Sequence, residues 1–145
     1  MATTISGRGK AFYVKFSGFD EMQKRLEALH GVELSEEIVE GAEEFLEAVG
    51  ERSDYLCPKD THSLVNSRRV FVERTRGRIR GAVSYGTVAG VKDPSLYAVY
   101  VHENPDAYHA PPTTWKFLEI AYAEMSRKAL PMIGAHVKRA LRAAR

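Results

Sequence analysis

A chain of 145 residues with 44% hydrophobic and 28% charged residues has the length and composition of one globular domain with a sizeable core. No apolar run approaches the roughly 20 residues that a membrane-spanning helix needs, and the N-terminal stretch lacks the apolar core of a secretory signal. The single cysteine, Cys57, excludes an intramolecular disulfide and a cysteine-built zinc site. We therefore expect a protein made in the cytosol, with no membrane partner.

The net charge of +2 conceals a strong asymmetry along the chain. Residues 20–54 hold 12 acidic and 3 basic side chains, a local net charge of −9, so the remainder carries +11. The basic residues concentrate in two segments, 68–80 and 127–145. Such segregation is typical of proteins that lie near nucleic acid or contact one another head to tail, although the solvated faces of one domain give the same pattern.

The N-terminal part predicts a tail, a strand and a first helix. Residues 1–10 are small and polar, and we expect a flexible tail ahead of a single domain over 11–145. Alternating apolar and polar positions over 11–16 predict a strand with one buried face, and helical spacing over 19–30 predicts a helix.

A long amphipathic helix is predicted next, from Ser35 as its N-cap to Leu56, before Pro58. One stripe of this helix should face the core: Ile38, Ala42, Phe45, Val49, Ser53 and Leu56. The glutamates lie elsewhere on the helix. We interpret them as solvated surface rather than as a metal or acid-catalysis site, because no histidine accompanies them in the sequence.

Beyond the proline the sequence predicts β-structure. Residues 64–75 and 78–85 are predicted as the strands of a hairpin joined by a glycine-containing turn. Residues 97–101 are predicted as a short apolar strand. Residues 86–94 and 104–112 are rich in glycine, proline and polar residues and should form loops.

Two helices close the chain. A threonine pair at 113–114 can cap a helix that buries Trp115, Leu118 and Tyr122, and Pro131 should kink or break it. A final helix follows and exposes its basic residues. The predicted fold class is therefore α+β, with a small antiparallel sheet packed by the long amphipathic helix and further helices in a single domain.

No motif for catalysis or cofactor binding emerges. His102-Glu103 followed by His109 fits no zincin or deaminase spacing. Cys57 follows a predicted helix C-terminus, where the helix dipole opposes thiolate formation, so a small buried residue is favoured over a nucleophile. The sequence predicts no enzyme, no cofactor and no metal site.

The hairpin from Arg68 to Arg80 is the most function-like basic feature. Arginines that alternate on a strand can follow DNA phosphates without reading the base sequence. The aromatic stacking platforms of single-strand binders are missing between them. Four residues are candidates for contact with DNA or with a neighbouring subunit: Arg74, Arg76, Arg78 and Arg80.

Three short motifs, in order, carry a resemblance to a known family. They are Cys-Pro-x-Asp-Thr-x-x-Leu after the long helix, Tyr-Ala-x-x-Val-His-Glu further along, and Lys-Phe-Leu-Glu-x-Ala at the start of the next helix. Their residues are Cys57, Pro58, Asp60, Thr61, Leu64, Tyr97, Ala98, Val101, His102, Glu103, Lys116, Phe117 and Leu118. Over residues 11–130 the chain resembles the tail-completion or head–tail joining family of long-tailed bacteriophages, also described as minor capsid or minor tail proteins.

One position departs from the pattern of that family. The family has glycine after Asp-Thr, where this chain has His62. Glycine there indicates a turn with positive φ, which histidine tolerates better than most residues. We expect a strained or remodelled turn at this point.

The resemblance implies a non-enzymatic virion protein of the phage neck or upper tail, made in the cytoplasm of the bacterial host. Its subunits would form a homo-oligomeric ring that joins the capsid connector to the tail tube, while genome DNA passes through the channel. Other neck proteins and the tail tube protein would be its partners. Two alternatives remain: a tail terminator ring that caps the tube, and a small DNA-binding protein that uses the arginine hairpin.

The charge asymmetry suggests how subunits of a ring would meet. Each subunit of a ring uses two different surfaces, so the acidic face of the long helix is expected to meet the basic face of a neighbour's last helix. The residues in this hypothesis are Glu40, Glu43, Glu44, Glu47, Arg139 and Arg142. Because each exposed ion pair contributes only about 0–1 kcal/mol, apolar contacts should supply most of the affinity.

Overall fold

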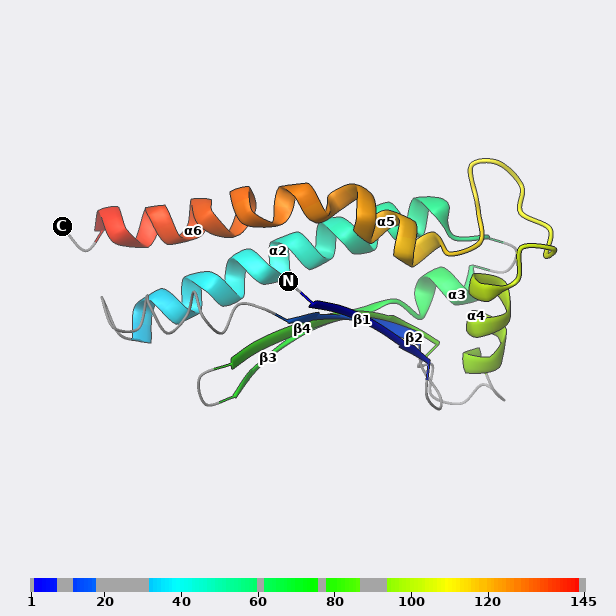
Figure 1. Ribbon diagram of the computed structural model, residues 1–145, viewed down its shortest axis with the longest axis horizontal. Helices are drawn as coiled ribbons and strands as arrows, with labels where there is room; N and C mark the ends of the chain where they lie inside the picture. The colour runs from blue at the N-terminus through cyan, green and yellow to red at the C-terminus, as the bar shows by residue number, and fades with distance from the viewer. Residues whose placement is uncertain are drawn as a thin grey trace.

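The structure of the protein is a computed structural model, and it describes residues 2–7, 12–17, 32–59, 62–75, 78–86 and 94–143. Its elements in chain order are β1 (Ala2–Gly7), β2 (Phe12–Ser17), α2 (Val32–Leu56), α3 (Ser63–Asn66), β3 (Arg69–Thr75), β4 (Arg78–Tyr85), α4 (Pro94–Glu103), α5 (Phe117–Met125), the 3-10 turn η1 (Ser126–Lys128) and α6 (Ala129–Ala143). They form one compact α+β arrangement, which confirms the predicted fold class (Figure 1).

The elements lie in three layers (Figure 1). The antiparallel sheet is one outer layer, α2 runs across it in the middle, and α5 and α6 run along the far side of α2. Helices α3 and α4 lie together at the end of the molecule where α2 finishes. Helix α2 is therefore covered on two sides.

The sheet has the order β1-β2-β4-β3, and all of its neighbouring strands are antiparallel. Strand β4 is interior and has the predicted bounds. Ile79, Val83 and Tyr85 are buried on it, whereas Arg78 and Arg80 are exposed. Burial alternates over residues 78–80 as predicted, but residues 81–85 are all buried, Ser84 included, so the predicted alternation fails in the second half of the strand.

The stripe predicted for α2 is buried along its whole length: Ile38, Ala42, Phe45, Val49, Ser53 and Leu56. Leu46, which lies outside that stripe, is also buried because two layers cover the helix. A side chain at Gly81 of β4 would collide with Cδ1 of Leu46, so glycine lets the helix lie close to the sheet.

Helices α2 and α6 approach each other closely at Gly41. A Cβ atom there would lie only 2.9 Å from the Cα atom of Ile133 and 3.3 Å from Cδ2 of His136. The missing side chain thus permits a close contact that buries Ile133 completely.

Residues 2–7 form β1, so the prediction of a flexible tail is wrong for them. The strand pairs with β2 in a continuous register, with Thr4 opposite Lys15 and Ile5 opposite Val14. Threonine and isoleucine are β-branched and favour strands, a local signal that the small polar composition of the segment obscured. The helix predicted over 19–30 lies outside the described residues.

The predicted strand over residues 97–101 is wrong, because this segment belongs to α4. Ala98, Val101 and His102 are buried at helical spacing, while Tyr97 and Tyr100 are exposed. A short apolar run does not distinguish a strand from a buried helix, and the helical period becomes visible only when His102 counts as a buried residue.

Two boundaries near α2 also differ from the prediction. Helix α2 begins at Val32 rather than at Ser35, since no helix breaker occurs in the intervening sequence. The segment 63–66 forms the short helix α3, so β3 begins at Arg69 rather than at residue 64. The predicted end of α2 at Leu56 is confirmed.

Helix α5 begins at Phe117, after Lys116 in the left-handed conformation, and not at the threonine pair. Trp115 therefore precedes the helix and is 38% exposed, so its predicted burial is wrong. Leu118 is buried as predicted, and Tyr122 is partly buried.

The break expected from Pro131 occurs slightly earlier, at η1. Pro131 lies in the first turn of α6, where its missing N–H removes no hydrogen bond from the helix.

Phe45 provides a test of the layered core. Phe45→Ala should lower the free energy of unfolding by roughly 3–5 kcal/mol, because the ring is 1% exposed between two layers. Urea denaturation followed by circular dichroism measures the change. Phe71→Ala is the matched control, since Phe71 is 51% exposed on the sheet and its loss should change stability by no more than about 0.5 kcal/mol. Equal losses in the two variants would contradict the described core.

Candidate functional site

The three motifs that carry the family resemblance meet at the end of the molecule where α2 finishes. The backbone N–H of Lys116 donates to the carbonyl oxygen of His102 over 2.7 Å, and the N–H of Thr114 donates to the carbonyl of Leu56 over 2.9 Å. The ring of Phe117 makes edge-to-face contacts with His102 and Tyr85, with ring centroids 5.0 and 5.2 Å apart. The second and third motifs are therefore joined directly, and the first is joined through its neighbour Leu56 and through the shared hydrophobic core.

Most motif residues are buried and form what we call the motif junction: Cys57, Leu64, Ala98, Val101, His102, Phe117 and Leu118. Tyr97, Glu103 and Lys116 remain partly or largely exposed. Asp60 and Thr61 lie outside the described residues. The buried motif residues thus hold the elements together, and the exposed ones can meet a partner.

Polar contacts at the junction centre on Glu103. Its Oε1 lies 2.8 Å from Nδ1 of His102, and its Oε2 lies 3.9 Å from Nζ of Lys116, which also contacts Glu119 at 3.0 Å. Burial lowers the pKa of His102, although the hydrogen bond with Glu103 opposes this shift. His102 is therefore a structural residue that the fold keeps neutral.

His62 has a left-handed backbone, with φ at 58°. This is the position where the family has glycine, and the positive φ that glycine indicated is present. The turn leads into α3, in which the N–H of Asn66 donates to the carbonyl of His62 over 2.9 Å. The expectation of an unfavourable backbone at His62 is thus confirmed.

Cys57 is fully buried, as predicted, and its thiol contacts the carbonyl of Pro58 at 3.6 Å. Burial raises the pKa of the thiol to about 12, and the nearby Asp54 adds to this effect. A thiol with such a pKa is protonated at neutral pH and is a poor nucleophile.

An open pocket of about 540 Å³ lies beside the junction. Its lining includes the motif residues Pro58, Tyr97 and Val101 together with the 107–113 segment. Tyr97 and Tyr108 of this lining are exposed, and so are Tyr100 of α4 and Trp115 just before α5; the exposed fractions are 58% for Tyr100 and 89% for Tyr108, two residues that the sequence did not single out. We call this region the aromatic end; its members are Tyr97, Tyr100, Tyr108 and Trp115.

A polar cluster at the surface of the core was also missed, because it unites residues far apart in the chain. The hydroxyl of Tyr85 donates to Asp54 over 2.7 Å and contacts the hydroxyl of Ser53. Arg68 forms ion pairs of 2.8 Å with both Asp54 and Glu47. Arg68 therefore joins the sheet end to α2 and is not available for DNA.

The candidate arginines of the hairpin lie on both faces of the sheet. Arg74, Arg78 and Arg80 are exposed, and Arg76 lies outside the described residues. Arg80 stands opposite Glu73 in the β3–β4 register, so an acidic residue interrupts the basic surface. Arg74 stands opposite Ile79 and lies on the face of the sheet that faces the helices. Arg78 and Arg80 lie on the other face.

The acidic and basic faces assigned to an intersubunit contact already touch within one chain. Glu44 contacts His136 of α6 at 2.6 Å, Glu40 lies 3.7 Å from the same ring, and Glu47 pairs with Arg68. Arg139 contacts this histidine at 3.1 Å. Four of the six candidate residues thus have a partner within the chain, although all six remain exposed.

The structure defines a small α+β protein whose motif segments meet at one end. No family model matches the sequence, and searches of curated proteins and of solved structures found no similar protein. Within the described part of the chain, no helix combines the length and the apolar character needed to cross a membrane.

The buried histidine of the junction predicts a specific pH dependence. Because the folded state lowers the pKa of His102 below its ordinary value of 6.5, the unfolded chain binds more protons under mildly acidic conditions. The contribution of His102 to stability is complete above pH 6.5 and is lost as the pH falls below it, by at most about 1.4 kcal/mol per pH unit. His102→Gln should flatten the dependence of unfolding free energy between pH 7 and pH 5.

His62→Asn is the control for this measurement, because asparagine accepts the left-handed backbone and His62 is exposed. This variant should keep the pH profile of the wild type. An unchanged profile in His102→Gln would contradict a neutral buried histidine.

Proposed function

We propose that the protein is a structural subunit of the phage neck or upper tail, where it forms a ring that joins the capsid connector to the tail tube. The observation that supports this proposal most is the meeting of three resemblance-bearing motifs at the junction. Residues 57–64, 97–103 and 116–118 are separate in the sequence, yet direct hydrogen bonds and ring contacts link the segments that carry them. If the similarity of these short motifs had arisen by chance, the motifs would not be expected to lie together in the fold.

The aromatic end supplies the apolar surface that such an assembly needs. Tyrosine and tryptophan are enriched at protein interfaces, because they bury a large area with few rotatable bonds. Tyr100 and Tyr108 project from neighbouring segments of this end and are largely exposed in the single subunit. We assign this surface to contact with the next copy in the ring.

Charge has a secondary role in the proposal. The exposed acidic and basic residues of α2 and α6 would orient neighbouring subunits, while the aromatic end supplies the affinity. Since Glu44 and Glu47 already have partners in their own chain, Glu43 and Arg142 are the better candidates for this role.

The specific observation in favour of a DNA-binding alternative is the exposed pair Arg78 and Arg80 on one face of β4. Glu73 opposite Arg80 weakens the positive potential of that face. The pair fits passing contact with DNA in a channel better than a complete binding surface. A tail terminator remains the alternative within the same structural class.

Deletion of the gene from the phage that encodes the protein tests the role. Electron microscopy of lysates should show filled heads separated from complete tails, and wild-type protein supplied from a plasmid should restore joined particles. Tails of abnormal length would instead identify a terminator. Intact infectious particles would contradict both structural roles and would leave the DNA-binding alternative.

The ring contact has its own test in the purified protein. Tyr100→Ser combined with Tyr108→Ser should shift the sedimentation profile from a discrete multimer to the monomer, because it removes the two most exposed tyrosines of the aromatic end. Circular dichroism should show that the monomer stays folded. Phe71→Ser, an exposed aromatic change on the sheet, is the matched control and should leave the multimer intact. Loss of the multimer in the control alone would place the contact on the sheet instead.

A further inference from the structure

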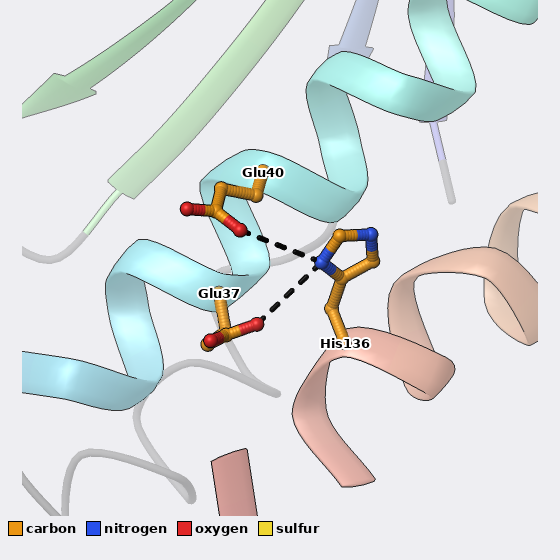
Figure 2. Close-up of side chains that lie close together, drawn as sticks. All are labelled: Glu37, Glu40 and His136. Carbon is orange, nitrogen blue, oxygen red and sulfur yellow. Dashed lines mark ion pairs between the residues drawn. The ribbon is translucent and has the colours of Figure 1, made fainter. Parts of the chain in front are cut away.

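Side chains of metal-binding type lie together where α6 passes the first half of α2 (Figure 2). Glu37 and Glu40 come from adjacent turns of α2, and His136 reaches them from α6. Nδ1 of the imidazole lies 3.5 Å from Oε2 of Glu37 and 3.7 Å from Oε2 of Glu40. One ligand atom from each residue lies within 4.8 Å of the other two.

In a neutral imidazole, the contacts of His136 favour the tautomer with its hydrogen on Nε2. This nitrogen lies 2.6 Å from a carboxylate oxygen of Glu44, which accepts. Nδ1 lies 3.1 Å from Nη2 of Arg139, and a guanidinium can only donate. Nδ1 therefore accepts from Arg139, and the oxygens of Glu37 and Glu40 lie 3.5 and 3.7 Å from the same nitrogen. A carboxylate that accepts from the far nitrogen is the usual outer shell of a metal-bound histidine.

Three atoms that can bind a metal ion thus lie close together, and the guanidinium of Arg139 stands beside them. Oε2 of Glu37 is buried and has no hydrogen-bond partner among the described residues. The cluster contains three carboxylates, from Glu37, Glu40 and Glu44, against the single guanidinium of Arg139. An excess of two negative charges around these atoms favours a divalent cation.

Two of the three distances between ligand atoms fit tetrahedral coordination. Nitrogen and oxygen ligands bind zinc at about 2.0–2.2 Å, which separates two tetrahedral ligands by about 3.4 Å. The observed separations from Nδ1 are 3.5 and 3.7 Å. The side chain of Glu40 is 61% exposed, so it can rotate to complete the site and leaves a path for the ion to enter.

Packing against α2 holds the imidazole of His136 in place before any ion binds. His136 is only 8% exposed, and the bare backbone of Gly41 lets its ring pack against α2. The histidine therefore does not have to be ordered when an ion binds, which lowers the entropic cost of binding.

We propose that Glu37, Glu40 and His136 bind a divalent transition-metal ion, with zinc as the best fit, and that this ion fastens α6 to α2. Water would complete the coordination, Glu44 would keep the hydrogen bond from Nε2, and Arg139 would turn to solvent as the ion takes its place beside Nδ1. An imidazole with two carboxylates suits zinc better than calcium or magnesium, which prefer oxygen ligands alone. The site does not depend on the assembly role proposed above.

Isothermal titration of zinc chloride into the full chain, after treatment with a chelator and its removal, tests the proposal. The expected result is one site per chain and a rise in melting temperature that the chelator reverses. His136→Gln should abolish binding, and Glu44→Gln should weaken it about 10- to 100-fold through the outer shell. Glu43→Gln is the matched control, because Glu43 is an exposed glutamate of the same helix outside the cluster.

Two further variants keep the result independent of folding. Glu40→Gln changes a largely exposed side chain and should leave the fold intact while it weakens zinc binding at least tenfold. Arg139→Gln removes the competing guanidinium and should tighten binding. Absence of saturable zinc binding by the wild type, or equal affinities in Glu40→Gln and Glu43→Gln, would overturn the proposal, and so would weaker binding in Arg139→Gln.

Discussion

Helix α2 must bury two faces at once, because the sheet covers one of them and α5 and α6 cover the other. Its apolar stripe alone does not achieve this. Glycine at position 81 admits Leu46 to the sheet, and glycine at position 41 admits α6 to the helix. The ion pairs of Arg68 with Asp54 and Glu47 then fix the same helix to the end of β3. Strands β3 and β4 and helices α5 and α6 all pack directly against α2.

The two candidate sites lie toward opposite ends of this helix. The motif junction gathers where α2 finishes, and the glutamate–histidine cluster lies in its first half (Figure 1). At the junction, buried residues such as His102 and Phe117 give rigidity, and the aromatic end beside them offers a surface to a partner. At the glutamate–histidine cluster, three carboxylates face one guanidinium, which leaves an excess of negative charge. The first arrangement suits assembly, and the second suits fastening within the subunit.

The sequence predicted best where the signal was local and long. The stripe from Ile38 to Leu56 and the strand β4 follow from periodicity, and the positive φ of His62 follows from a glycine expected at its position. Prediction failed at α4, where a short apolar run fits either period. It also could not find the metal candidate, because His136 is far from Glu37 and Glu40 in the chain and no local spacing relates them. The glutamates of α2 were interpreted as solvated surface because no histidine lies near them in the sequence. The fold brings His136 beside them.

The position of α2 in the middle layer also governs the order in which the chain can fold during synthesis. The helix leaves the ribosome after β1 and β2 but before β3 and β4, so the sheet is completed only after the helix has emerged, and the layer of α5 and α6 follows later still. Until then the side chains of Ile38 and Phe45 remain open to water and to other nascent chains. The β3–β4 hairpin pairs neighbouring residues and can shield one face early. The opposite face stays uncovered until α5 and α6 have been made.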